Sequence, residues 1–336
     1  MAVLGKTTRV IRSALLYLCL VLASAWGVLA LYFSNLPSPA LRLCLAIGFL
    51  VFAVAVWIKR RTPLMSVPFW AVFAAAVVWW VLIPPSHDRV WRPDHAVLPR
   101  AAVSGDVVKI SGVRNFDYRS RSDFTPHYEE RTFDLSHLTG IDFYISYWRP
   151  GAVAHTFLSF TFDNAPPLSI SIEARREIHE GFDPLGSLFK QFELIYVVGD
   201  ERDLVGSRAN HRNETVYLYR LNTRPEDARR LLLIYLERIN EIYDRPEFYH
   251  LLSNSCTINI IRYANAIGRT GGFDIRHFLN GWIDGYLYYS GRLNTSRPLD
   301  ELRAQSQIND AARAAETAAD FSAEIRKGVP PSIGNW

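Results

Sequence analysis

The sequence contains little cysteine and no marked excess of either charge, and both features exclude classes of protein. Three cysteines occur in 336 residues; Cys19 and Cys44 lie inside apolar runs, which leaves Cys256 as a lone thiol and excludes a disulfide-stapled fold. A net charge of +4 from scattered basic residues gives no reason to expect nucleic acid as a partner. The histidines form no His-Glu-x-x-His motif and no close pair, so no metal or other cofactor is expected.

Long apolar runs are present near the N-terminus. They cover Ser13 to Phe33, Leu41 to Ile58 and Val67 to Ile83, and about 20 apolar residues suffice to cross a bilayer as a helix. We therefore predict three transmembrane helices that form a membrane anchor over residues 1–84. A cleaved signal peptide is the alternative for the first run, but this run is longer than a usual signal core and two more runs follow it.

The charges between the runs predict the orientation of this anchor. Lys6, Arg9 and Arg12 precede the first run and Lys59-Arg60-Arg61 follows the second, whereas the link between these two runs carries only Arg42. Because basic loops stay on the cytoplasmic side, the N-terminus is expected in the cytoplasm and the chain after residue 84 outside. In a bacterium, this arrangement is an inner-membrane protein with a periplasmic domain.

Residues 100–336 have the pattern of an α+β domain. Short segments rich in β-branched and aromatic residues predict sequential strands and hence an antiparallel sheet. Helices are expected at 224–243, to cover the sheet, and at Thr257–Ile267, where Gly268 provides the stop. An Ala-rich surface helix is expected at 308–327. The predicted strands are 107–110, 130–135, 141–148, 154–162, 168–174, 193–198 and 215–221.

Cys256 is the candidate nucleophile because it stands at the start of the helix predicted for Thr257–Ile267. The free N–H groups and the positive dipole end of a helix N-terminus stabilise a thiolate and lower the pKa of the thiol. The alternative is that Cys256 is a small buried packing residue, which is common for free cysteine. The choice depends on whether the chain supplies partners.

His155 is the best candidate for a catalytic base, since it begins a predicted strand whose alternation places it on one face with Phe157 and Ser159. A hairpin centred near Ala165 places Phe157 opposite Glu173, so that His155 is a diagonal neighbour of this carboxylate. Glu173 is then the orienting group, unless it simply pairs with Arg175. Further candidates for substrate binding or support are Ser159, Asn254, Tyr249 and Arg175.

Several stretches resemble the family called the Lnb N-terminal periplasmic domain. The order of strand His, strand Glu and helix Cys is also similar to the circularly permuted branch of the papain-like NlpC superfamily. The family pattern Asn-Cys-Thr-Thr is altered here, because Ser255 separates Asn254 from Cys256 and Ile258 replaces the second Thr. The stretches that carry the resemblance are Val113–Arg119, Ala154–Phe160, Ser169–Glu177, Glu193–Val198 and Asn254–Thr257.

The resemblance implies a permuted papain-like thiol enzyme in the periplasm. Lnb itself is associated with N-acylation of bacterial lipoproteins, so a similar role would move an acyl chain from membrane phospholipid to a cysteine and then to a lipoprotein amine. By match to the family's motifs, Cys256 carries over as nucleophile, His155 as base and Glu173 as the third residue. The partners expected from the resemblance are thus a phospholipid and a lipoprotein.

Three functions stay open at the level of sequence. The first is acyl transfer through a Cys256 thioester, with backbone N–H groups at the helix start, including that of Cys256, stabilising the oxyanion. The second uses the same dyad as a cysteine peptidase or amidase on peptide or cell-wall amides. The third is a membrane-anchored scaffold without catalysis, in which Cys256 is buried packing.

Overall fold

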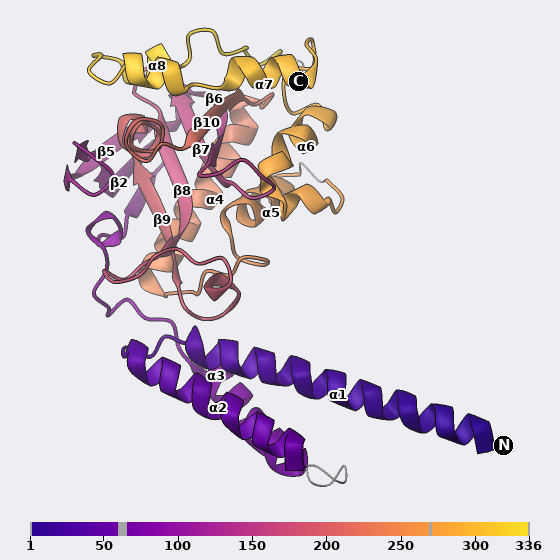
Figure 1. The fold of residues 1–336 in the computed structure, drawn as a ribbon. Coiled ribbons are helices and arrows are strands. Elements are labelled where there is room, and N and C mark those ends of the chain that lie inside the picture. The colour runs from indigo at the N-terminus through magenta and orange to yellow at the C-terminus, as the bar shows by residue number, and fades with distance from the viewer. Residues whose placement is uncertain (1, 60–65, 269–270, 335–336) are drawn as a thin grey trace. The chain divides into compact units, whose positions relative to one another are not determined.

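The structure is a computed structural model that describes residues 2–59, 66–268 and 271–334. The chain divides into two compact units: residues 1–86 with 181–193, and residues 87–180 with 194–336 (Figure 1). The first unit is built from apolar helices, and the second contains the sheet and the remaining helices. Each unit is described by itself.

The first unit contains α1 (Ala2–Tyr32), α2 (Pro39–Lys59) and α3 (Val67–Leu82). Two helical segments, Val10–Tyr32 and Pro39–Lys59, are long and apolar enough to cross a membrane. The prediction of a third transmembrane helix is wrong, because α3 has 16 residues and a spanning helix needs about 20. It ends just before Pro84 and Pro85, which cannot continue a helix.

The basic residues that predict the orientation of α1 and α2 are only partly visible. Arg60 and Arg61, and the side chains of Lys6 and Arg9, lie outside the described residues. The three helices pack on one another through an apolar cluster that includes Leu20 of α1, Phe49 of α2 and Phe69 of α3. The cytoplasmic N-terminus therefore stays a prediction from the sequence.

The second unit is organised around an eight-stranded sheet of order β1-β2-β9-β8-β7-β6-β10, with β5 paired to β2. Each of the seven predicted strands is present. The β1–β2, β2–β5, β6–β7, β6–β10 and β7–β8 pairings are antiparallel, whereas β2 and β9 run parallel, so the sheet is mixed rather than purely antiparallel. Its strands are β1 (Arg100–Ser104), β2 (Val107–Arg114), β5 (Tyr128–Asp134), β6 (Leu138–Tyr147), β7 (His155–Phe162), β8 (Leu168–Arg175), β9 (Glu193–Gly199) and β10 (Thr215–Arg220).

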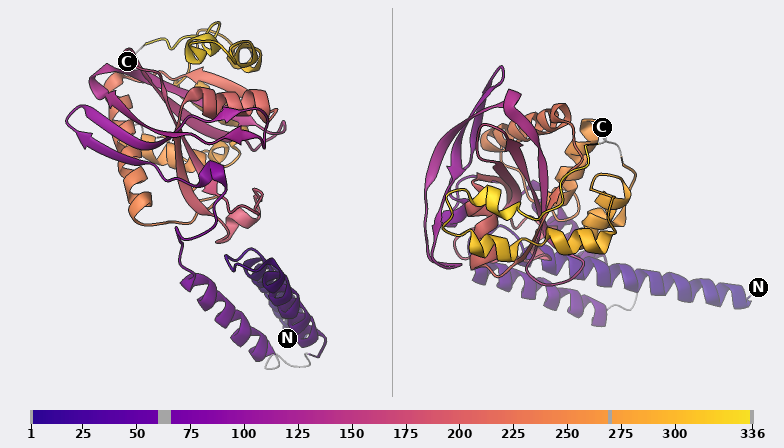
Figure 2. Two further views of the ribbon diagram at one scale, coloured as in Figure 1. Left: turned by 90° about the vertical axis from the view of Figure 1, so that its left-hand side faces the viewer. Right: turned by 90° about the horizontal axis from the view of Figure 1, so that it is seen from above.

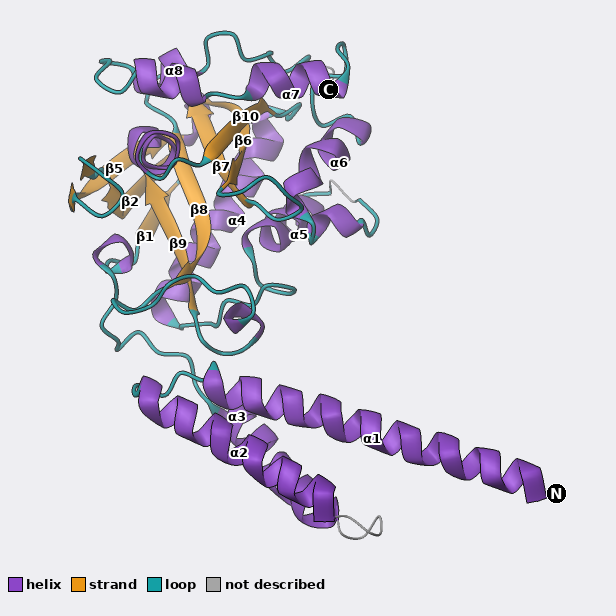
Figure 3. Ribbon diagram, in the orientation of Figure 1, coloured by secondary structure: helices purple, strands orange, loops and turns teal. Residues whose placement is uncertain are grey.

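Helical segments cover both faces of this sheet (Figures 2 and 3). On one face α4 places Tyr235 edge-on against Phe160 of β7, with ring centroids 5.7 Å apart. Alternation along β7 sends Phe157 to the opposite face. The other segments of this unit are α4 (Pro225–Asp244), α5 (Cys256–Ala266), α6 (Ile283–Tyr289), α7 (Leu299–Ser306), α8 (Asn309–Ala314), α9 (Phe321–Ile325), the π-helix η5 (Arg202–His211), the small β3–β4 pair (Asp117–Tyr118, Phe124–Thr125) and the short 3₁₀ turns η2 (Pro93–His95), η3 (Leu135–His137), η6 (Ile275–His277) and η7 (Asn280–Trp282). The 3₁₀ turn η4 (Gly186–Leu188) belongs to the first unit.

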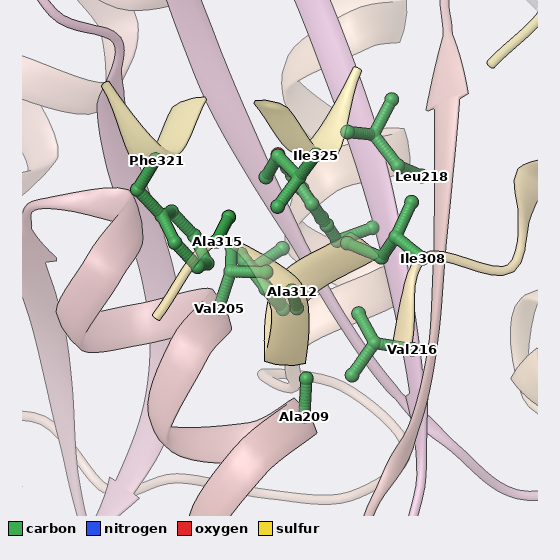
Figure 4. Packing of buried hydrophobic residues seen from close by; sticks show 11 residues of the cluster. Val205, Ala209, Val216, Leu218, Ile308, Ala312, Ala315, Phe321 and Ile325 are labelled. Carbon is green, nitrogen blue, oxygen red and sulfur yellow. The ribbon is translucent and has the colours of Figure 1, made fainter. Parts of the chain in front are cut away.

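The helix predicted at the surface over 308–327 is instead two short helices, α8 and α9, and each of them buries one apolar side against the core. Figure 4 shows Ala312 and Ala315 with Phe321 and Ile325 from α9, packed against Val205 of η5. These apolar side chains are buried, whereas Arg313 and Asp310 on the other side of α8 are exposed, so the segment lies at the surface with one face packed inward. The small alanines allow α8 to approach η5 closely.

Buried charges fasten α9 to the sheet. Arg326, the residue after α9, donates two hydrogen bonds of 2.7 Å to the Glu201 carboxylate and one of 2.9 Å to Asp142. Tyr144 donates to the same glutamate at 2.8 Å. Glu201 and Asp142 are almost fully buried, so their charges need compensation, which Arg326 supplies to both and Arg220 supplies to Asp142 as well.

We predict that Arg326→Ala lowers the free energy of unfolding by about 3 kcal/mol, because it leaves two buried carboxylates without their shared partner. Chemical denaturation of the detergent-solubilised protein measures this. The matched control is Arg313→Ala, whose ion pair with Asp310 is exposed and which should change stability by less than about 0.5 kcal/mol. Equal losses in the two variants would contradict the prediction.

Candidate active site

The sulfur of Cys256 stands at the start of α5, as the sequence predicts. Cys256 is the first residue of the helix, Ser255 is its extended N-cap (φ −109°, ψ 174°), and Gly268 adopts φ +89° just beyond the helix end. The first N–H groups of a helix have no partner within it, so they and the helix dipole favour negative charge here. The side chain is buried, with 4% of its surface exposed.

The first strand residues of β7 lie beside this helix start. Thr156 and Thr257 share a hydrogen bond of 2.8 Å between their hydroxyl oxygens, which joins β7 to α5. Asn280 of η7 donates to Thr257 at 2.8 Å, accepts from the Ala154 N–H at 2.8 Å, and lies 3.9 Å from the Cys256 sulfur. Three segments far apart in the sequence therefore meet at the thiol.

His155 contacts the thiol with one ring nitrogen and the sheet with the other. Its side chain has a hydrogen bond with Cys256, and its Nε2 lies 2.7 Å from the Ser171 hydroxyl oxygen. Because an imidazole has only two nitrogens, Nδ1 is the one left for the sulfur. His155 thus bridges the nucleophile and β8.

Glu173 is linked to His155 mainly through Ser171. The Ser171 hydroxyl donates to Glu173 Oε1 at 2.9 Å, whereas His155 Nε2 lies 3.8 Å from the same oxygen. The predicted register was wrong by two residues: Leu158 pairs with Ile170 and Ser159 with Ser169, which centres the hairpin on Asn164. This register keeps Glu173 on the predicted face and brings it closer to His155.

Two further residues hold the Glu173 carboxylate. Arg208 of η5 donates to Oε1 at 2.6 Å, and His95 Nε2 lies 3.4 Å from Oε2. Burial of Glu173 favours its neutral form, but the positive charge of Arg208, the hydrogen bond from His95 and the charge of His155 outweigh it. They hold the pKa of Glu173 well below its ordinary value, so the carboxylate stays ionised.

The same balance applies to the thiol. Burial of Cys256 opposes ionisation, but the charge of His155 and hydrogen bonds from His155 and Thr156 more than compensate and lower the pKa of the thiol to about 6. A substantial fraction of Cys256 is therefore thiolate at neutral pH. This is the condition that a cysteine nucleophile requires.

Of the four supporting candidates, the structure brings only Tyr249 to the thiol. Tyr249 is buried and its hydroxyl oxygen accepts a hydrogen bond from the backbone N–H of Cys256, and burial raises the pKa of its phenol well above the ordinary value. Its hydroxyl is thus protonated and lies next to the helix start. It can donate a hydrogen bond to an oxygen that forms there.

The other three supporting candidates make contacts elsewhere and not with the thiol: these are Ser159, Asn254 and Arg175. Ser159 is bonded to Ser169 at 2.6 Å within the sheet. Asn254 donates to the Phe248 carbonyl at 3.0 Å and shapes the turn before α5, which agrees with the extra residue that separates it from Cys256. Arg175 donates to the His95 carbonyl at 3.0 Å rather than pairing with Glu173.

The sequence reasoning missed Ser171, Arg208, His95 and Asn280. Ser171 could have been predicted from the sequence, because it lies two residues before Glu173 and therefore points to the same face of the strand. The others come from η5, the segment before β1, and the turn before α6, and no periodicity places these segments against Glu173 or Cys256. Among the described residues, no group of three or more His, Cys, Asp or Glu side chains is placed to hold a metal ion.

Exposed apolar side chains flank the segments that surround the thiol. Trp148 and Val153 belong to the β6–β7 loop, whose Ala152 carbonyl accepts from the Gly281 N–H at 2.9 Å. Trp282 follows Gly281 directly, and Ile275 belongs to η6, which contacts both α5 and η7. Each of these four side chains is more than 40% exposed.

The comparisons with known proteins agree with the resemblance seen in the sequence. Residues 124–281, a little under half of the chain, match the family model described as the Lnb N-terminal periplasmic domain. The matched segment contains His155, Ser171, Glu173, Cys256 and Asn280. Comparison with curated proteins and with solved structures gives no match.

We predict that alkylation of Cys256 by iodoacetamide follows a titration with a midpoint near pH 6. The thiolate is the reactive form, and it is lost as the pH falls through the thiol pKa of about 6. The experiment uses a Cys19→Ser/Cys44→Ser background, because both of these thiols are exposed. A midpoint near the ordinary cysteine value of about 8.5 would contradict the assignment.

Proposed function

Because residues 124–281 belong to the Lnb N-terminal periplasmic domain family, we propose that the protein is a membrane-anchored thiol acyltransferase. Its acyl donor is a phospholipid and its acceptor is an amine, of which a lipoprotein amine is the example from the family resemblance. The observation that carries the proposal is the connected series Cys256–His155–Ser171–Glu173. A nucleophile, a base and an orienting carboxylate are thereby in contact.

In the first half-reaction His155 takes the thiol proton and the Cys256 sulfur attacks the carbonyl carbon of the ester. The resulting oxyanion is stabilised by backbone N–H groups at the start of α5 and by the protonated Tyr249 hydroxyl. The intermediate collapses by breaking the ester C–O bond, and His155 returns its proton to the departing alkoxide. The products are a Cys256 thioester and a lysophospholipid.

In the second half-reaction the acceptor amine attacks the thioester carbonyl, and His155 accepts the proton that the nitrogen loses. The C–S bond then breaks and the sulfur leaves as the thiolate, which is a good leaving group because its pKa is about 6. An amide is formed and the dyad is restored. Glu173 stays ionised throughout and, through Ser171, orients the His155 ring and compensates its charge.

Two features support a lipid donor over a water-soluble one. The chain has two helices long and apolar enough to span a bilayer, and exposed Trp148, Val153, Ile275 and Trp282 flank the segments around the thiol. Tryptophan and aliphatic side chains partition readily into the membrane interface. The proposed topology has a cytoplasmic N-terminus and a periplasmic second unit with a permuted papain-like arrangement.

The amidase alternative shares the first chemical steps and differs in its substrate and in using water as acceptor. The protein would then consume peptide or peptidoglycan fragments and leave phospholipid intact. The scaffold alternative requires Cys256 to be inert, which is at odds with a thiol pKa of about 6. Donor consumption and thiol reactivity therefore separate the three functions.

We predict that the protein purified from membranes carries a fatty-acyl mass increment on Cys256 that hydroxylamine removes, because thioesters are cleaved by this reagent. Intact-protein mass spectrometry measures the increment. Cys256→Ser should lack the hydroxylamine-sensitive increment and fold normally, since the change is nearly isosteric.

The matched control is Cys44→Ser, which removes a thiol of the membrane part and should leave the adduct in place. Incubation with phospholipid vesicles and, separately, with peptidoglycan fragments identifies the donor. A hydroxylamine-sensitive adduct that persists in Cys256→Ser would contradict the acyl-enzyme proposal. Consumption of the fragments without any loss of phospholipid supports the amidase instead.

A further inference from the structure

We propose that His95 is a positioning residue that acts on Cys256 through Glu173 and His155. His95 belongs to η2, in the segment between the membrane helices and the first strand of the sheet. Its ring lies 3.4 Å from Glu173 Oε2, and the ring is almost fully buried. The inference rests on the proposed function, because it concerns how that thiol is activated.

The hydrogen bonds of the His95 ring fix the direction of donation. Its Nδ1 accepts from the backbone N–H of Arg176 at 3.1 Å, so this nitrogen carries no proton. Burial lowers the pKa of His95 and keeps the ring neutral, although Asp94 and Glu173 oppose this effect. The single ring proton is therefore on Nε2, the nitrogen that lies 3.4 Å from Glu173 Oε2.

The two oxygens of Glu173 have different partners. Oε1 accepts from Arg208 at 2.6 Å and from Ser171 at 2.9 Å, whereas His95 faces Oε2. Loss of the Oε2 donor leaves the carboxylate free to turn about its terminal bond, and it also removes one of the groups that keep it ionised. Either change weakens the acceptor on which the Ser171–His155 link depends.

The consequence reaches the thiol through charge. The positive charge of His155 lowers the pKa of Cys256, and Glu173, held by His95 and Arg208, is the carboxylate that compensates His155. A less well-held Glu173 weakens the Ser171–His155 link, so the ring that supports the thiolate is positioned less firmly beside the sulfur. The pKa of Cys256 should therefore rise when His95 no longer donates.

A merely structural role for His95 predicts a different pattern. The residue also anchors its segment, because its carbonyl accepts from Arg175 Nε at 3.0 Å and its Nδ1 accepts from the Arg176 N–H. The carbonyl contact survives any substitution. The two ring contacts can be separated, because Gln imitates the Nε2 donor and Asn imitates the Nδ1 acceptor.

The experiment compares His95→Gln with His95→Asn in the full chain with Cys19→Ser and Cys44→Ser. The readout is the pH profile of iodoacetamide alkylation of Cys256, with the melting temperature as a measure of folding. We expect His95→Gln to keep a midpoint close to the parent value. We expect His95→Asn to raise the midpoint by about one pH unit, which at pH 6.5 reduces the thiolate fraction about threefold.

The outcomes separate this inference from the proposed function. If Cys256 in the parent protein is inert to alkylation, the thiol-enzyme proposal itself fails. If the parent is reactive and both variants keep its midpoint, only the role of His95 is overturned. It is also overturned if Asn preserves the profile and Gln does not, or if any change in reactivity simply follows the melting temperature.

Discussion

The ionised carboxylate of Glu173 is the constraint on which the rest of the site depends. Its side chain is 14% exposed, so its charge must be compensated by neighbours rather than by water. Arg208, Ser171 and His95 supply donors, and His155 lies behind Ser171. Each of these residues comes from a different segment, so the charge of one carboxylate depends on the packing of four parts of the chain.

The sheet separates this support from the nucleophile. Phe157 is stacked with His155 on the face that carries η5, whereas Thr156 bonds to α5 on the other face. His155 is the first residue of β7, so its ring lies at the end of the strand, where groups from both faces are within reach. A base at a strand end can therefore connect a thiol and a carboxylate that the sheet would otherwise keep apart.

The sequence predicts the parts of this arrangement that depend on short-range patterns. Alternation located seven strands, the Gly268 stop located the end of α5, and motif order identified Cys256, His155 and Glu173. The missing parts are long-range. The register of β7 and β8 depends on the geometry of the turn around Asn164. The length of α3 depends on the residue at which the helix ends. The positions of Arg208, His95 and Asn280 depend on packing between segments that are far apart in the sequence. No periodicity encodes these contacts.

The C-terminal segment acquires a physical role from the same geometry. Arg208 belongs to η5, and Val205 and Ala209 of η5 pack against Ala312, Phe321 and Ile325. The π-helix that presents the guanidinium to Glu173 is therefore held between the sheet and the last two helices. Arg326 fixes α9 to Asp142 and to Glu201, and Glu201 directly precedes η5, so these buried charges also hold the segment that carries Arg208. The packing of α8 and α9 on η5, although distant from Cys256, thus determines the position of Arg208, the cationic partner of Glu173.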